Sequence, residues 1–283
     1  MRYGGPDGAL AALHCIDAEL DDGVLTIALN RPDARNRLNV ALTLEMAGLL
    51  PLVAGDDAVR VVVIRGRGPD FCAGTDTQDF DDAARHGEHA LRAARAAADD
   101  WRGRGLRQLP QPVIALVHGH CLGGGIGILE GCDIVFAADD GEFGLSEIGN
   151  DGDSDGRLAA GPVGKSISRV MQPRAASFHA LTGARFDGRQ AERNGLVTRS
   201  FPAAELERET ETLARELAAK DPLALRFTKE TLAHVGAMSW DGALNFTAAK
   251  LAEIKSLQAG RPSSRAAAVQ SFLSGASKPG LGA

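Results

Sequence analysis

The pattern of apolar and polar positions divides the chain into an α/β part followed by a helical part. Two β-prone runs between residues 10 and 30, separated by Asp-Asp-Gly, predict a hairpin. Two continuous apolar runs, VRVVVIRG (59–66) and QPVIALVHG (111–119), predict strands that are covered on both faces, and DIVFAAD (133–139) predicts a further strand. Helical patterns lie between them, at residues 39–54, in an alanine- and arginine-rich segment that ends near Arg107, and in CLGGGIGILEGC (121–132), which begins the next helix. This alternation predicts βαβ units and a mainly parallel sheet.

The second half of the chain has a different pattern. From about Gly164 onward we find only helical patterns, whose apolar positions recur at the helical spacing. We therefore predict an α/β core over residues 1–200 and a helical region over residues 201–283. A helical tail with an apolar face commonly packs against a neighbouring subunit, so this pattern also predicts an oligomer.

Composition narrows the classes of protein. The chain has 283 residues, 44% hydrophobic and 24% charged, which is typical of a soluble globular protein with a sizeable core. A net charge of −6 gives no general reason to bind nucleic acid or an anionic membrane, and the apolar runs are too short to cross a bilayer. The four cysteines form no C-x-x-C pair and the first residues show no signal pattern, so we expect a reduced, cytoplasmic protein. The single tyrosine, Tyr3, argues against chemistry that needs a tyrosine hydroxyl.

Glycine-rich segments follow two of the predicted strands. We name them the FCAGTD loop (71–76) and the GGG segment, HGHCLGGGIG (118–127). Because the carboxyl ends of parallel strands lie at one edge of a sheet, two N–H groups from these segments could converge into an oxyanion hole. Tight packing of a helix on a strand is the alternative reading of the GGG segment. The dinucleotide fingerprint G-x-G-x-x-G is not met there, so we expect no Rossmann cofactor site.

Several ordered motifs resemble those of one known family. They are LNRPDARNRLN, VVVIRGRGPDFCAGTD, PVIALVHGHCLGGG with CDIVFAADDGEFGLSE, and LTGARFDGRQAERNGLV with SFP. In order and spacing they resemble the enoyl-CoA hydratase/isomerase (crotonase) superfamily over nearly the whole chain. FGLSEI, SWDGALNFTAAKL and SFLSGASKPGL are most similar to the hydroxycinnamoyl-CoA (feruloyl-CoA) hydratase-lyase branch. The resemblance implies the crotonase fold, a ClpP-like spiral of ββα units with a C-terminal helical trimerisation region.

The resemblance also implies roles for particular residues. The backbone amides of Thr75 and of Gly124, the middle glycine of GGG, would polarise a thioester carbonyl and hold the enolate. Glu147, in GLSE, would be the acid/base carboxylate, whereas without the resemblance it reads as an ordinary solvated glutamate. Substrate-binding positions are expected at Ala73, Asp76, Phe80, His120, Asp151, Asp155 and Phe246.

The sequence departs from the family at two places. Hydratases that use two glutamates carry the first just after GGG, where this chain has Gly127, so a mechanism with one carboxylate is implied. The hydroxycinnamoyl branch holds a phenol with tyrosine hydroxyls, and the matching positions here are Phe80 and Phe246. These departures argue against a site that grips a phenol and against the retro-aldol cleavage that depends on it.

The segment NDGDSDG (150–156) invites two other readings. It contains G-x-S-x-G, but no convincing strand precedes Ser154 and no histidine partner is evident, so a hydrolase elbow is not expected. It also contains D-x-D-x-D-G, but Pro162 occupies the position where a calcium loop needs glutamate. We interpret it as an insertion beside Glu147, whose aspartates would raise the pKa of that glutamate, orient a polar substrate group or supply a second acid/base. A solvated loop without such a role is the alternative.

An acidic protein must bind the phosphates of coenzyme A locally. The resemblance points to the DARNR loop and the C-terminal helices, which makes Arg35 and Lys250 the candidates, with Lys255 as an alternative. Coenzyme A would be part of the substrate; we expect no tightly bound cofactor, and the histidines suggest no metal set. Surface ion pairing is the alternative role for these basic residues.

We therefore predict an acyl-CoA enzyme, a homotrimer or dimer of trimers, that hydrates an α,β-unsaturated acyl-CoA with or without cleavage. Double-bond isomerisation with a single glutamate is the first alternative. A catalytically silent acyl-CoA-binding homologue is the second, and an aspartate nucleophile from the inserted segment is a more distant one.

Overall fold

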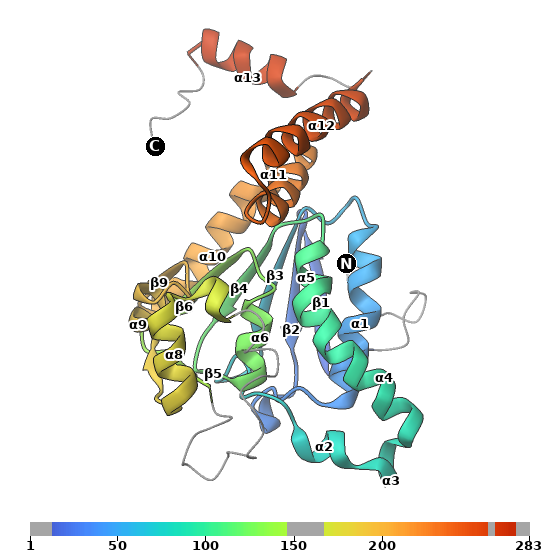
Figure 1. The fold of residues 1–283 in the computed structure, drawn as a ribbon, viewed down its shortest axis with the longest axis vertical. Helices are drawn as coiled ribbons and strands as arrows, with labels where there is room; N and C mark the ends of the chain where they lie inside the picture. Colours follow the sequence, from blue (N-terminus) through green and yellow to red (C-terminus); the bar gives the residue numbers. More distant parts are fainter. Residues whose placement is uncertain (1–12, 146–166, 260–263, 276–283) are drawn as a thin grey trace. The chain divides into compact units, whose positions relative to one another are not determined.

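The computed structural model describes residues 13–145, 167–259 and 264–275 (Figure 1). The chain divides into two compact units, Met1–Ala219 and Lys220–Ala283, which are described separately below. The predicted residues Glu147, Asp151 and Asp155 lie outside the described residues. None of the described helices is long and apolar enough to cross a membrane.

The first unit is built on a six-stranded sheet with the order β1-β2-β3-β4-β6-β9. Its strands are β1 (Ile16–Asp21), β2 (Val24–Leu29), β3 (Val61–Gly66), β4 (Val113–Val117), β6 (Ile134–Ala138) and β9 (Arg199–Phe201). Strands β1 and β2 are antiparallel and every other neighbouring pair is parallel. The predicted hairpin and mainly parallel sheet are therefore confirmed. The hairpin turns at Asp22 and Gly23, whose φ angles of 44° and 81° suit a tight two-residue turn.

Both faces of the sheet are covered, as the continuous apolar runs predicted. Along β3, Val62 and Ile64 belong to the main core, whereas Val61 and Val63 belong to a smaller core under α10 (Ala203–Ala218). Helix α1 (Val40–Ala54) contributes to the main core and matches the helix predicted at 39–54. It begins where the side chain of Asn39 accepts a hydrogen bond from the amide of Leu42.

The predicted helical segment that ends near Arg107 is divided in the structure. It consists of α2 (Thr77–Asp81), α3 (Ala83–His86), α4 (Glu88–Asp99), a π-helical segment η2 (Asp100–Gly105) and α5 (Leu106–Gln108). The interruptions have local causes. Asp82 caps α3 by accepting from the amide of Arg85, and Gly87 has a φ of 75°, which ends α3 and starts α4.

A second, three-stranded sheet has the order β5-β7-β8. It consists of β5 (His120–Leu122), β7 (Glu142–Gly144) and β8 (Phe186–Asp187). The expectation of only helical patterns after Gly164 was wrong, because β8 and β9 lie in that part. Strands of two or three residues are too short to show a periodicity in the sequence. The helices around them are η1 (Pro32–Ala34), η3 (Gly123–Gly125), α6 (Ile126–Leu129), α8 (Pro173–Thr182) and α9 (Gly188–Arg193).

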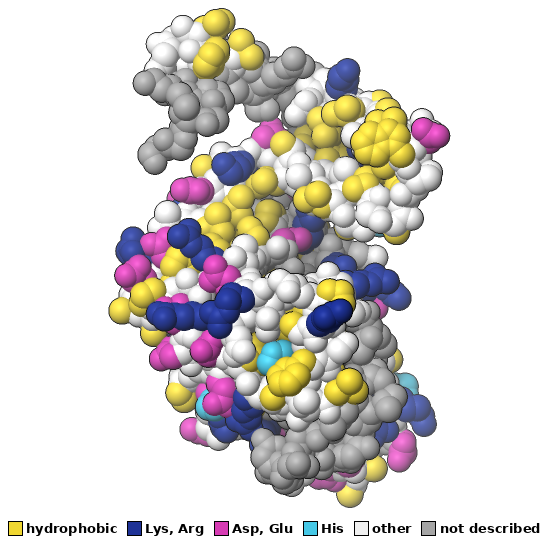
Figure 2. Space-filling model, turned by 60° about the vertical axis from the view of Figure 1, so that its left-hand side comes forward, with side chains coloured by type: hydrophobic (Ala, Val, Ile, Leu, Met, Phe, Trp, Pro, Cys, Tyr) yellow, Lys and Arg dark blue, Asp and Glu magenta, His cyan; other side chains and the backbone are white. Residues whose placement is uncertain are grey.

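Helix α10 belongs to the first unit, because its residues Leu206 and Ala214 pack against the sheet. The compact helical unit thus starts at Lys220, whereas the sequence suggested a helical region from residue 201. The second unit contains α11 (Pro222–Val235), α12 (Trp240–Gln258) and α13 (Ser264–Leu273). Figure 2 shows hydrophobic side chains gathered on this helical unit, where Leu232 and Trp240 are 72% and 79% exposed.

Candidate active site

Hydrogen bonds join the FCAGTD loop to the GGG segment at the carboxyl edge of the main sheet. The amide of Cys72 donates to the carbonyl of His120 (2.9 Å), and the amide of Leu122 donates to the carbonyl of Cys72 (3.0 Å). Cys72 and Cys121 thus form an isolated parallel bridge between the segments that follow β3 and β4. The structure brings the two glycine-rich segments together, as the parallel sheet predicted.

Thr75 forms an isolated parallel bridge with Leu38, and its own amide points away from Leu38. On either side of it, the carbonyl of Gly74 accepts from Leu38 (2.8 Å) and the amide of Asp76 donates to the carbonyl of Leu38 (2.9 Å). Because successive amides of an extended chain point to opposite sides, the Thr75 amide faces away from Leu38. Thr75 as a whole residue is exposed.

Gly124 lies directly against Thr75. It is the second residue of η3, and the first amides of a helix have no acceptor within the helix. A Cβ atom placed on Gly124 would lie 3.2 Å from the Thr75 nitrogen and 2.6 Å from its hydroxyl oxygen. Only glycine fits at position 124 without a shift of the neighbouring Thr75 atoms. The Thr75 amide nitrogen and the backbone of Gly124 therefore lie in one small region.

Other predicted substrate-binding residues of the FCAGTD loop have structural partners. Asp76 accepts from both Nη1 and Nη2 of Arg31, at 3.2 and 3.1 Å. The amide of Ala73 donates to the carbonyl of Arg35 (2.9 Å). These contacts fix the loop on the segment that precedes α1.

Phe80, another predicted substrate-binding residue, is 6% exposed and packs in a small core with Val40, Leu91 and Ala94.

Asp70 links two predicted ligand-binding residues, and the sequence did not single it out. One carboxylate oxygen accepts from the backbone amide of His120 (3.0 Å) and lies 2.5 Å from His120 Nδ1; the other accepts from Arg35 Nε (2.9 Å). Burial favours a higher pKa for Asp70, but the hydrogen bonds from His120 and Arg35 outweigh burial and lower its pKa below the usual value. His120 Nε2 also lies 3.6 Å from Glu142, which pairs with Arg185.

Phe246 and Lys250 lie on α12 of the second unit. Lys250 Nζ pairs with Glu230 (2.7 Å) and Glu253 (3.0 Å), and these carboxylates raise the pKa of the amine. The same amine lies 5.5 Å from the centre of the Phe246 ring. Lys255, the alternative cation, is exposed on the same helix.

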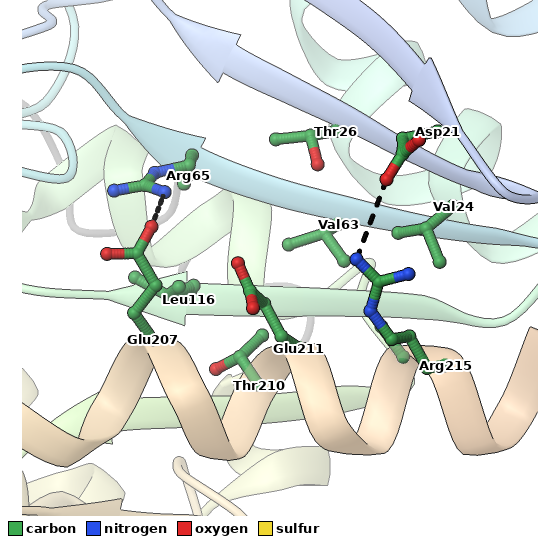
Figure 3. A pocket seen from close by; sticks show the side chains of 11 residues that line it. Asp21, Val24, Thr26, Val63, Arg65, Leu116, Glu207, Thr210, Glu211 and Arg215 are labelled. Carbon is green, nitrogen blue, oxygen red and sulfur yellow. Dashed lines mark hydrogen bonds and ion pairs between the residues drawn. The ribbon is translucent and has the colours of Figure 1, made fainter.

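A cavity between α10 and the main sheet does not involve the two glycine-rich segments (Figure 3). Val63 and Leu116 of the sheet and Thr210 of α10 line it. At its rim Arg65 pairs with Glu207, and Arg215 lies 3.5 Å from Asp21. These ion pairs connect α10 to the sheet.

The described residues contain no group of three or more histidine, cysteine or acidic side chains that could hold a metal ion.

The six-stranded sheet, the three-stranded sheet and the joined glycine-rich segments agree with the crotonase fold. The sequence matches the family described as enoyl-CoA hydratase/isomerase over residues 19–258. It is 34% identical over 268 residues to hydroxycinnamoyl-CoA hydratase-lyase of Pseudomonas fluorescens, covering 94% of this chain and 95% of that protein. It is 31% identical over 255 residues to the mitochondrial Delta(3,5)-Delta(2,4)-dienoyl-CoA isomerase of Homo sapiens, covering 86% of this chain and 75% of that protein.

Solved structures agree with the sequence comparison. The crystal structure of enoyl-CoA hydratase from Bacillus anthracis has a TM-score of 0.80 and 26% identity, and the match covers 92% of this chain and 96% of that one. The chain belongs to the enoyl-CoA hydratase/isomerase family and is an enzyme of that family. The predicted family, the crotonase fold and the enzymatic character are confirmed, whereas trimerisation stays a prediction.

Proposed function

We propose that this enzyme hydrates an α,β-unsaturated acyl-CoA, with Thr75, Gly124 and Glu147 in the reacting centre. The observation that supports this most directly is the close approach of Gly124 to the Thr75 amide, in a member of this family. Preorganised N–H donors stabilise the charge that develops on a thioester oxygen during enolate formation.

In the proposed reaction, Glu147 takes a proton from water while the water oxygen bonds to the β-carbon. The electrons of the double bond move onto the thioester oxygen, where the amides of Thr75 and Gly124 hold the enolate. Glu147 then returns the proton to the α-carbon, so that one water is added and no cofactor is consumed. The coenzyme A phosphates are proposed to contact Arg35, whose side chain is 45% exposed, and Lys250.

Isomerisation of a double bond is the second candidate. It is supported by the similarity to a dienoyl-CoA isomerase and by Gly127, which stands where two-glutamate hydratases carry a carboxylate. One carboxylate suffices for this reaction, because the same group removes a proton from one carbon and returns it to another. Like the hydratase, the isomerase is proposed to act as a homotrimer or dimer of trimers.

The test is a panel of aliphatic and aromatic enoyl-CoA thioesters, followed by loss of the conjugated absorbance and by product mass. A hydratase product gains the mass of one water, an isomerase product keeps the substrate mass, and a lyase product is shorter. Glu147→Gln should lower kcat by about 10²–10⁴-fold with little change in KM. The exposed Glu205→Gln on α10 is the matched control and should keep full activity. Binding without turnover across the panel would point to a catalytically silent homologue instead.

A further inference from the structure

A buried arginine approaches the paired amides from the π-helical segment η2. Arg102 is only 4% exposed, although arginine is rarely buried to this degree. The segment continues α4 with the wider turn of a π-helix, a rare conformation that is frequent at functional sites. The neighbouring Arg104 has a side chain that is 72% exposed, so the burial is specific to Arg102.

The side chain of Arg102 is held at both ends of its guanidinium group. Nε donates to the carbonyl of Ala98 (2.7 Å), one turn earlier, and Nη1 donates to the carbonyl of Gly124 (3.2 Å). The backbone of the segment is equally constrained, because a Cβ atom on Gly131 would lie 2.0 Å from the Arg102 carbonyl oxygen. Glycine at position 131 thus allows the segment to approach the main chain beside α6.

The guanidinium group and the Thr75 amide face the same side of Gly124. The position of a Cβ atom on Gly124 is 2.9 Å from Arg102 Nη1 and 3.2 Å from the Thr75 nitrogen. A positive charge that is shielded from water interacts strongly with negative charge that develops nearby. The charge is also felt by Cys72: burial raises the pKa of this thiol to about 11, and Arg102 and Arg31 oppose the rise.

We infer that Arg102 is a positioning residue for the oxyanion hole: it binds the carbonyl of Gly124, in the peptide group that follows the Gly124 amide, and places a buried positive charge near the Thr75 amide. This role rests on the proposed function, because it requires a thioester oxygen at Thr75 and Gly124. It predicts that Arg102 acts mainly on the transition state and on the polarisation of the bound carbonyl, with little effect on ground-state affinity.

The test uses a chromophoric thioester, 4-(dimethylamino)cinnamoyl-CoA, whose absorbance moves to longer wavelength when its carbonyl is polarised. Wild-type protein should bind it with a red shift, and Arg102→Gln should bind it with a much smaller shift. On the enoyl-CoA that wild type turns over fastest, Arg102→Gln should lower kcat by about 10- to 100-fold, less than the loss of a direct oxyanion donor, with little change in KM. Arg104→Gln on the same segment is the matched control and should behave as wild type.

Arg102→Lys keeps the charge but loses the forked contact to Ala98 and Gly124, and it provides a second test if the glutamine variant does not fold. It should retain most of the red shift with a smaller loss of kcat. A red shift in Arg102→Gln as large as that of wild type would overturn the inference. Complete loss of the shift in a folded Arg102→Lys would also overturn it. Absence of a red shift in wild type itself would instead refute the oxyanion hole of the proposed function, and the role of Arg102 with it.

Discussion

Gly124 and Thr75 approach each other so closely that a methyl group on Gly124 would lie 2.6 Å from the Thr75 hydroxyl oxygen. The same methyl group would lie 3.2 Å from the Thr75 amide nitrogen. A side chain at position 124 requires the Thr75 hydroxyl and the Arg102 guanidinium to move, and it presses on the Thr75 amide, one of the proposed oxyanion donors. The smallest possible substitution at Gly124 is therefore a direct probe of the site.

Gly124→Ala should lower kcat by about 10²–10³-fold, because displacement of one donor from an oxyanion hole has a cost of this order. Steady-state kinetics with the thioester that wild type hydrates provides the measurement, and circular dichroism checks the fold. Gly103→Ala is the matched control, since no heavy atom lies within 4 Å of its added methyl group. Equal activity of the two variants would refute the role of Gly124.

Asn36 joins the loop before α1 to the loop after β3 through hydrogen bonds to three backbone groups. It is fully buried, its side-chain amide donates to the carbonyls of Arg67 (2.9 Å) and Asp70 (2.7 Å), and its side-chain oxygen accepts from the amide of Arg31 (2.9 Å). Asn36→Ala should lower the free energy of unfolding by about 2–4 kcal/mol, because buried polar groups lose their partners. Urea unfolding followed by circular dichroism measures the difference.

The substitution Asn36→Ala also strains the backbone, and a control variant must separate this loss of stability from the loss of the hydrogen bonds. Its φ is 54°, and alanine disfavours this left-handed conformation. Asp22→Ala is the matched variant, since Asp22 has a φ of 44° in an exposed turn. A loss in Asn36→Ala no larger than the loss in Asp22→Ala would show that the side-chain hydrogen bonds contribute nothing.

Features that depend on a short stretch of sequence were predicted, whereas features that depend on contacts between distant residues were not. The strands around Val62 and Ile114 and the helix over residues 39–54 were predicted, because long apolar runs and a helical pattern are local signals. The convergence of the FCAGTD loop and the GGG segment followed from parallel strands alone. Strands β8 and β9 were missed because two or three residues carry no periodic signal.

The site residues that the sequence did not reveal depend on distant partners. Asp70 acquires its role from His120, 50 residues away, and from Arg35. In the sequence WRGRG, Arg102 and Arg104 look alike; only the π-helical turn and the glycines at 124 and 131 distinguish the buried arginine from the exposed one. Such placements require the packed structure, because no local pattern encodes them.

The lowered pKa of Asp70 makes the fold sensitive to acid. A carboxylate whose folded pKa lies below its unfolded value stabilises the fold above the unfolded pKa, near 4, and loses that contribution as the pH falls through the folded pKa. Asp70→Asn should therefore be less stable than wild type at pH 7, and the difference should shrink below about pH 4. Urea unfolding between pH 3 and 7 tests this; the exposed Asp33→Asn should track wild type throughout. A difference that stays constant with pH would contradict the assignment.

The exposed apolar residues of the second unit should be covered by other copies of the chain. Leu232, Trp240 and Leu251 are 72%, 79% and 55% exposed, and large exposed apolar patches mark interaction sites. Sedimentation velocity should show wild type as a homotrimer or a dimer of trimers. Leu232→Glu and Leu251→Glu should shift it toward the monomer, because a buried, unpaired carboxylate opposes association. Leu44→Glu on α1 of the first unit, where the leucine is 39% exposed, adds the same charge and should leave the assembly intact. A monomeric wild type, or unchanged assembly in both α11 and α12 variants, would show that these helices are not the interface.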